Sequence, residues 1–130
     1  MEVRMDGRKA IITGGSAGLG MAMAMEFNRS GADVAIVGRR KEALDVAKEK
    51  IQSVGGGKII AIAADIRQTH DCEQVFNKVV EELGAIDILV NNAGTSQRGP
   101  FLEVSDELWQ DDLDLKLFAA VRLSRLVIPG

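Results

Sequence analysis

The fold of this chain is decided by a stretch near its start, Ala10-Ile11-Ile12-Thr13-Gly14-Gly15-Ser16-Ala17-Gly18-Leu19-Gly20. A short apolar run ends at Thr13, a glycine-rich turn follows, and an alanine- and methionine-rich segment, residues 21–27, continues from it. Strand, glycine loop and helix in this order are typical of a nucleotide-binding βαβ unit. A glycine-rich turn with the spacing G-x-x-x-G-x-G can also be purely structural, so the interpretation depends on the rest of the chain.

The glycines of this loop suit the binding of phosphate. Gly14 can adopt a backbone angle that a Cβ forbids, so the chain can turn sharply off the strand. Gly18 and Gly20 leave the first helical turn bare, so phosphate oxygens can reach backbone N–H groups at the positive end of the helix dipole.

The bulk composition indicates an ordinary globular protein. The 130 residues are 46% hydrophobic and 27% charged, which predicts one α/β domain over residues 1–130. The net charge of -3 gives no sign of nucleic-acid binding. No apolar run approaches the ~18 residues of a membrane span, and the first residues lack the apolar core of a signal peptide. We therefore expect a cytoplasmic protein with no membrane or nucleic-acid partner.

The single cysteine and the single histidine offer no metal or nucleophilic site. Cys72 falls where a helix would bury a small side chain, so we interpret it as a core residue rather than a reactive thiol. His70 lies beside Thr69, which is a plausible N-cap of the same helix. We predict no metal ligands in this chain.

Strand-like and helix-like segments alternate, which predicts a parallel sheet with helices on both faces. We expect strands at residues 9–13, 33–37, 58–63 and 86–90, and helices that begin near 18, 69 and 105 and end near 31, 84 and 128. Another helix lies between the second and third strands. Two apolar stripes at helical spacing are predicted to face the sheet: Leu44, Ala47, Ile51 and Val54, and Cys72, Val75, Phe76, Val79 and Leu83.

The end of the second strand bears on the choice of dinucleotide. An acidic residue about 20 positions past the glycine motif usually holds the adenosine ribose hydroxyls. Here Gly38 is followed by Arg39 and Arg40, whose guanidinium groups suit a 2′-phosphate. This favours NADP(H), with NAD(H) as the other possibility. Alternatively, both arginines are solvated residues at a helix start and pair with Glu42 or Asp45.

Asp65 follows the third strand at the same edge of the sheet. Open α/β sheets bind ligands at the carboxyl ends of their strands, and Asp65 can accept a hydrogen bond from an adenine amino group, with the Ile66 backbone alongside. A lone aspartate after a strand can instead cap the next helix.

Taken together, Thr13–Gly20, Asp65 and Asn91-Asn92-Ala93-Gly94 resemble the short-chain dehydrogenase/reductase family, over residues 6–128. The resemblance implies a Rossmann-type doubly wound sheet of strand order 3-2-1-4. It also implies a bound NAD(H) or NADP(H) and hydride transfer between an alcohol and a carbonyl of a small-molecule substrate. Asn91 is interpreted as mainly structural, because asparagine side chains can tie neighbouring strand ends together.

The resemblance also assigns the cofactor contacts. It implies that the pyrophosphate lies on the loop of residues 14–20, that the adenine contacts Asp65 and Ile66, and that Asn92, Ala93 and Gly94 line the cofactor. With the two arginines, the candidate cofactor-binding residues are Gly14, Ser16, Ala17, Gly18, Leu19, Gly20, Arg39, Arg40, Asp65, Ile66, Asn92, Ala93 and Gly94.

Two departures from the family pattern bear on activity. Where the family usually carries an asparagine in its proton relay, seven residues past a tryptophan, this chain has Lys116 after Trp109. Lys116 either donates to the relay water or is a solvated helix lysine. The family's catalytic serine and Tyr-x-x-x-Lys pair lie beyond the next strand, and this chain has no tyrosine. We therefore assign no catalytic residue and expect the cofactor-binding half of a longer enzyme, inactive alone.

Two other interpretations stay open: a non-catalytic dinucleotide-binding module, and an inert fragment. A methyltransferase is disfavoured, since that class usually keeps an acidic residue where Gly38 stands. The last helix carries more apolar residues than one sheet face needs, and the family often packs this helix against its twin. We therefore expect a homo-oligomer through residues 105–128.

Overall fold

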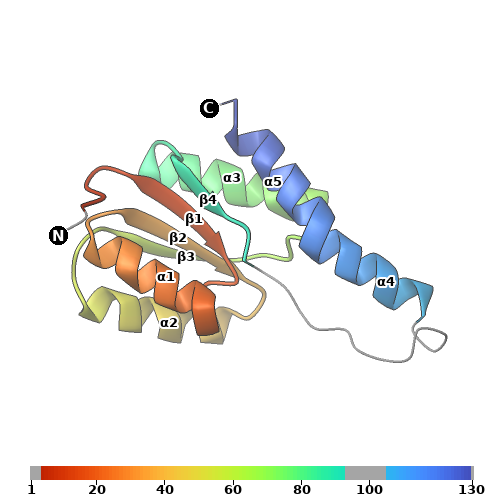
Figure 1. The fold of residues 1–130 in the computed structure, drawn as a ribbon, viewed down its shortest axis with the longest axis horizontal. Helices are drawn as coiled ribbons and strands as arrows, with labels where there is room; N and C mark the ends of the chain where they lie inside the picture. Colours follow the sequence, from red (N-terminus) through yellow and green to blue (C-terminus); the bar gives the residue numbers. More distant parts are fainter. Residues whose placement is uncertain (1–3, 93–104, 130) are drawn as a thin grey trace.

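The computed structural model describes residues 4–92 and 105–129. Its centre is a parallel four-stranded sheet of order β3-β2-β1-β4 with helices on both faces (Figure 1). The strands are β1 (Lys9–Thr13), β2 (Asp33–Gly38), β3 (Ile59–Ala63) and β4 (Ile88–Val90). The helices are α1 (Gly18–Arg29), α2 (Lys41–Ser53), α3 (Thr69–Leu83), α4 (Asp106–Leu113), the π-helical segment η1 (Asp114–Phe118) and α5 (Ala119–Val127). The predicted fold class and strand order are confirmed.

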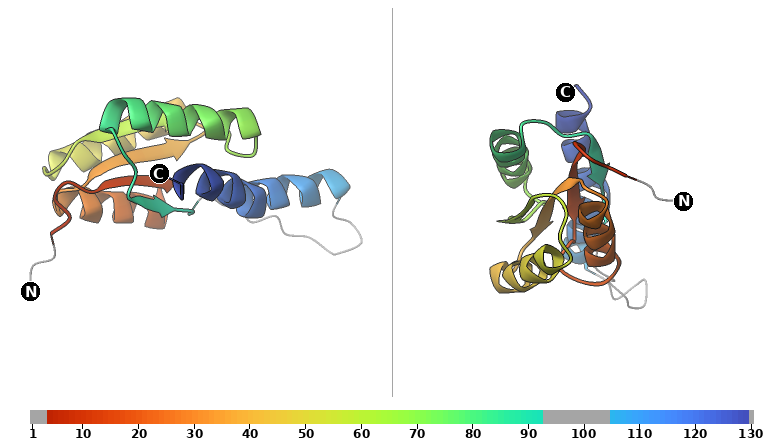
Figure 2. Two further views of the ribbon diagram at one scale, coloured as in Figure 1. Left: turned by 90° about the horizontal axis from the view of Figure 1, so that it is seen from above. Right: turned by 90° about the vertical axis from the view of Figure 1, so that its left-hand side faces the viewer.

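Alternating residues of the strands face two separate cores. On β1, Ile11 packs in the layer of α3 and α5, whereas its neighbour Ile12 packs in the layer of α1 and α2, and both are fully buried. The two helical layers lie on opposite faces of the sheet (Figure 2). Strands covered on both faces are expected to be apolar throughout, and the run Ala10–Thr13 is buried at every residue.

The predicted apolar stripes are the ones that pack on the sheet, except at one position in each. Leu44, Ala47 and Ile51 of α2 and Cys72, Val75, Val79 and Leu83 of α3 are buried. Val54 follows the last residue of α2 and Phe76 lies at the rim of its stripe, so both are half-buried. The Cys72 sulfur lies 3.2 Å from the carbonyl oxygen of Ile66, and burial raises the pKa of the thiol. The interpretation of Cys72 as a core residue is confirmed.

Some predicted boundaries were wrong. Thr69 is the first helical residue of α3 and not its N-cap, a position held by Gln68, which makes no side-chain cap bond. The third strand begins at Ile59 rather than at Lys58. The fourth strand begins at Ile88 rather than at residue 86, because pairing with β1 starts at Ala10.

The predicted continuous helix over residues 105–128 is interrupted. Ser105 caps α4 as predicted, with its hydroxyl accepting a hydrogen bond from the Leu108 backbone 3.2 Å away. The five residues of η1 then form a π-helical turn before α5 begins. Such a turn holds one more residue than an α-helical turn. The side chains of α4 are therefore rotated about the helix axis relative to those of α5.

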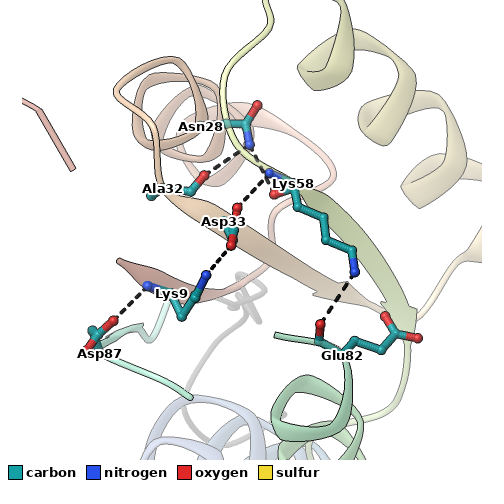
Figure 3. Close-up of polar contacts among 7 residues, drawn as sticks. All are labelled: Lys9, Asn28, Ala32, Asp33, Lys58, Glu82 and Asp87. Carbon is teal, nitrogen blue, oxygen red and sulfur yellow. Dashed lines mark hydrogen bonds and ion pairs between the residues drawn. The ribbon is translucent and has the colours of Figure 1, made fainter. Parts of the chain in front are cut away.

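At the amino ends of the strands, carboxylates join neighbouring strand starts (Figure 3). Asp87 accepts a hydrogen bond from the Lys9 backbone at 2.9 Å, and Asp33 accepts one from the Lys58 backbone at 2.8 Å. Asp33 also pairs with the Lys9 side chain. Adjacent strand starts are thereby fixed relative to one another, which supports the register of the whole sheet. In the described part of the chain, no helix is both long and apolar enough to cross a membrane.

Candidate functional site: a pocket at the carboxyl edge of the sheet

The loop between β1 and α1 requires glycine for two different physical reasons. Gly14 and Gly18 have φ angles of +70° and +57°, which L side chains rarely adopt. At Gly20 the limit is space: a Cβ would overlap the carbonyl oxygen of Gly14 and lie 2.5 Å from the Asn92 side-chain nitrogen. At Gly15, to which sequence analysis gave no role, a Cβ would lie 2.6 Å from Ile36 Cγ2 of β2. The loop therefore lies tightly against the sheet, with the helix start left bare.

Asn92 ties the ends of β1 and β4 beside this loop. Its backbone N–H donates to the Thr13 hydroxyl at 3.0 Å, and its side-chain amide donates to the Gly14 carbonyl at 3.3 Å. The Thr13 hydroxyl in turn donates to the Val90 carbonyl at 3.3 Å. The expectation that an asparagine joins neighbouring strand ends is therefore met by Asn92 rather than by the exposed Asn91. Ala93 and Gly94, which were also predicted to line the cofactor, lie outside the described residues.

A pocket of about 490 Å³ opens beside the loop and brings part of the predicted site together. Its walls are the glycine loop, the end of β2, the turn after β3 and one residue of η1: Gly14, Ser16, Val37, Gly38, Arg39, Arg40, Ala64, Asp65, Ile66 and Leu115. Six of the predicted cofactor residues meet here, from three separate strand ends. Ala17, Gly18 and Leu19 are exposed at the start of α1 and do not line this pocket.

Arg39 and Arg40 are exposed at the mouth of the pocket. Asp45, one of the two acids proposed to neutralise them, is paired with Lys41 at 3.1 Å. Within residues 4–92 and 105–129, neither arginine forms an ion pair. Two guanidinium groups are therefore available to an anion at this position.

Asp65 is held by Arg67, a residue that sequence analysis missed. The Arg67 guanidinium forms a two-pronged contact, Nε to Oδ1 at 2.9 Å and Nη2 to Oδ2 at 2.8 Å, and its backbone N–H donates to Oδ1 at 3.1 Å. The Arg67 hydrogen bond is the main cause that holds the pKa of Asp65 below its ordinary value, with a smaller contribution from Arg39. Asp65 is therefore charged at neutral pH. It does not cap α3, because the N-cap position of that helix is held by Gln68.

The two remaining positions of interest lie on η1. Leu115 contributes an apolar wall to the pocket, a role that the helical pattern did not predict. Lys116 lies outside the pocket, with its ammonium 3.0 Å from a carboxylate oxygen of Asp112. Lys116 is half-exposed and Asp112 is 25% exposed, so this geometry favours the solvated alternative for Lys116.

The fold and the pocket define the class of protein. A parallel sheet with a bare glycine loop after β1, and a pocket at the carboxyl ends of three strands, is the arrangement of a dinucleotide-binding α/β domain.

The comparisons with known proteins agree and give the family. Residues 8–130 match the family short chain dehydrogenase. A short chain dehydrogenase of Pseudocercospora fijiensis is 36% identical over 129 residues, which are 98% of this chain and 41% of that protein. The chain belongs to the short-chain dehydrogenase/reductase family of oxidoreductases.

Solved structures extend the likeness to the whole fold. The L-sorbose reductase of Gluconobacter frateurii, solved with NADPH and L-sorbose, superposes with a TM-score of 0.95 at 36% identity. The match covers 100% of this chain and 49% of the reductase. An NADH-dependent reductase, A1-R′, solved with NAD, superposes with a TM-score of 0.87 at 30% identity, over 95% of this chain and 52% of its own. This chain thus spans about half the length of these relatives.

Proposed function

We propose that this chain binds a nicotinamide adenine dinucleotide at the pocket, and that it favours NADP(H) over NAD(H). The loop fits a pyrophosphate, because Gly18 has nothing within 4 Å of a Cβ position and because Gly20 lets α1 begin close against Gly14, which leaves the first helical turn without side-chain bulk. The backbone N–H groups at the start of α1 would hold the pyrophosphate, together with Gly14, Ser16, Ala17 and Leu19. The base would lie near Asp65 and Ile66, and Asn92, Ala93 and Gly94 would line the cofactor further along.

The preference for NADP(H) rests on one observation. Arg39 and Arg40 line the same pocket as Gly14 and Asp65, and both lack an ion-pair partner among the described residues. A carboxylate at the end of β2 would repel a 2′-phosphate, whereas an arginine fork binds it through charge-assisted hydrogen bonds. Relatives do not decide the matter, since one solved neighbour carries NADPH and another NAD.

The test is the substitution Arg39→Asp, which replaces the attraction for phosphate with repulsion. Calorimetric titration is expected to show a loss of NADPH affinity of about tenfold or more, with a much smaller change for NADH. Arg29→Asp is the matched control, because Arg29 is exposed on α1, pairs with Glu26 and does not line the pocket. Equal loss of both affinities in Arg39→Asp, or the same shift in Arg29→Asp, contradicts the assignment.

In a longer protein, the activity supported by this site is oxidation or reduction of an alcohol/carbonyl pair on a small molecule. The dinucleotide, when bound, supplies or accepts the hydride. Residues 1–130 would form the cofactor-binding domain, positioning the dinucleotide and excluding water from its adenine end. We expect no turnover from the 130 residues alone, because the sequence contains no tyrosine to act as the family's general acid. NADPH-dependent reduction of a carbonyl by this chain would contradict that expectation.

A non-catalytic dinucleotide-binding module is the second candidate function. It is favoured by a pocket that joins the glycine loop to the ends of β2 and β3 in a chain whose sequence contains no tyrosine. The two candidates share the same binding prediction and differ only in whether a longer form with Tyr-x-x-x-Lys turns over substrate. We also propose a cytoplasmic location and a homo-oligomer formed through residues 105–128.

A further inference from the structure

Arg67 lies behind the pocket rather than in its wall. Asp65 and Ile66 line the pocket and the next residue, Arg67, does not. The Arg67 side chain is only 24% exposed, and its planar fork holds both carboxylate oxygens of Asp65. A two-pronged contact of this kind fixes the orientation of a carboxylate as well as its charge.

The fork leaves Asp65 a limited capacity for a ligand. Oδ1 accepts two hydrogen bonds, from the Arg67 backbone and from Nε, while Oδ2 accepts one, from Nη2. Because a carboxylate has room for about four donors, Oδ2 keeps one acceptor position among the contacts of the described residues. Asp65 therefore presents a charged acceptor in a fixed orientation and no donor. A ligand N–H is favoured there, and a ligand carbonyl oxygen is repelled.

Arg67 also joins this wall of the pocket to the helical wall. Its Nη1 lies 3.5 Å from Asp111 on α4, and its carbonyl accepts a hydrogen bond from Arg122 of α5 at 2.8 Å. Asp111 precedes Leu115 by four residues, and Leu115 lines the pocket. Arg67 thus contacts both Asp65, which follows β3, and the helical segment that contributes Leu115 to the pocket.

We propose that Arg67 is a positioning residue that makes the base end of this pocket selective for a ring with an exocyclic amino group. It does so by fixing Asp65 as an acceptor and by fastening the helix of Leu115 beside the pocket. The inference rests on the proposed binding of an adenine dinucleotide and adds the residue that selects the base.

The test compares NADPH with its hypoxanthine analogue, in which a carbonyl replaces the adenine amino group. Calorimetric titration is expected to show NADPH binding about tenfold more tightly to the wild-type chain. Arg67→Gln is expected to reduce this ratio to about threefold or less, since the carboxylate then rotates and is hydrated. Arg67→Lys is expected to give an intermediate ratio, because an ammonium keeps the charge and loses the fork.

Arg122→Gln is the control for helix docking alone. It removes the bond to the Arg67 carbonyl and the contact with the Phe118 ring, but leaves the fork on Asp65 intact. The ratio should stay near the wild-type value in this variant even where its thermal stability falls. A collapse of the ratio in Arg122→Gln equal to that in Arg67→Gln overturns the proposal.

The remaining outcomes distinguish a failure of the role proposed for Arg67 from a failure of the proposed dinucleotide binding. A wild-type ratio preserved in Arg67→Gln overturns the role of Arg67 while the binding function stands. If Arg67→Gln does not fold by circular dichroism, the ratio in Arg67→Lys decides by the same criterion. Absence of binding of both dinucleotides to the wild-type chain contradicts the proposed function, and the inference with it.

Discussion

At the scale of single residues, the site depends on side chains that are absent as much as on those present. Gly20 is helical, and in most helices alanine at such a position would stabilise the protein by about 0.5–1 kcal/mol. Here the added Cβ would meet the Gly14 carbonyl and the Asn92 amide. Because α1 lies so close to the end of β1, alanine at position 20 is expected to destabilise the protein rather than stabilise it.

We predict that Gly20→Ala lowers the free energy of unfolding by about 1–3 kcal/mol, the usual cost of overpacking. It should also displace the loop and weaken dinucleotide binding. Gly38→Ala is the matched control for stability, since its Cβ would lie 3.4 Å from Leu44, an ordinary contact. Urea unfolding of both variants measures the difference. A Gly20→Ala protein as stable as the wild type would show that the loop is not tightly packed.

Asp65 predicts a pH dependence of stability. Its folded-state pKa is lowered, chiefly by Arg67, so its contribution is complete above the unfolded value of about 3.9 and disappears as the pH falls through the folded value. The difference in unfolding free energy between the wild-type chain and Asp65→Asn should therefore be constant near neutral pH and shrink below about pH 4. Urea unfolding across this range measures it. A difference in unfolding free energy that grows as the pH falls would contradict a lowered folded-state pKa of Asp65.

Residues that were singled out by their chemical type could be predicted from the sequence. Residues whose role depends on their contacts in the folded chain were missed. Arg39 and Asp65 were predicted from their residue type and their position after a strand, and both line the pocket. Gly20 was predicted to give phosphate access to the helix start, whereas the structure shows it packed closely against Gly14 and Asn92. Arg67 was missed although it stands only two residues beyond Asp65, because an arginine in a turn has many solvated uses. Only the geometry distinguishes a fork on a carboxylate from a surface arginine.

At the scale of elements, the π-helical segment decides which side chains reach the pocket. Ala119 and Leu123 of α5 are buried in the layer of α3, while Leu115, one residue before the middle of η1, lines the pocket. A regular helix has 3.6 residues per turn, and the extra residue of a π turn changes the phase by about 100°. The periodicity used for prediction assumes an uninterrupted α-helix, which is why the interruption was not predicted.

We predict that deleting Lys116 restores a continuous α-helix and rotates α4 relative to α5. The deletion should carry Leu115 away from the pocket and Asp111 away from Arg67, with a fall in NADPH affinity of about tenfold and little loss of helical circular dichroism. Lys116→Ala is the control that keeps the register, because it removes the pair with Asp112 without changing the number of residues in η1. Unchanged affinity in the deletion variant would remove the role assigned to η1.

At the scale of the whole molecule, the segment formed by α4, η1 and α5, called the helical arm below, exposes more apolar side chains than packing on the sheet requires. Large side chains stay exposed along it: Leu108, Trp109, Leu113, Leu117, Phe118, Val121 and Ile128. The four-stranded sheet also ends at β4, whose three residues are only half-buried. Apolar surface of this extent indicates an interaction site. Both cores could be predicted from apolar runs and stripes, and the strand order from the family resemblance. The exposure of individual side chains along the last helix could not be predicted, because exposure depends on the whole fold.

We predict concentration-dependent self-association of the chain through this arm, measured by sedimentation equilibrium. Leu117→Glu should shift the protein toward the monomer, because it places a charge within the apolar contact. Val46→Glu is the matched control: Val46 is 52% exposed and Leu117 50%, but Val46 lies on α2. A monomeric wild-type chain, or an equal effect of both substitutions, would remove the arm as an interface.

The most direct test of the account is a calorimetric titration of the purified 130-residue chain with NADPH and, separately, with NADH. The account predicts saturable binding of one dinucleotide per chain, with NADPH bound about tenfold more tightly because Arg39 and Arg40 meet the 2′-phosphate. Saturable binding with NADH the tighter ligand would contradict the cofactor assignment. No heat of binding with either would contradict the claim that these residues form a dinucleotide site.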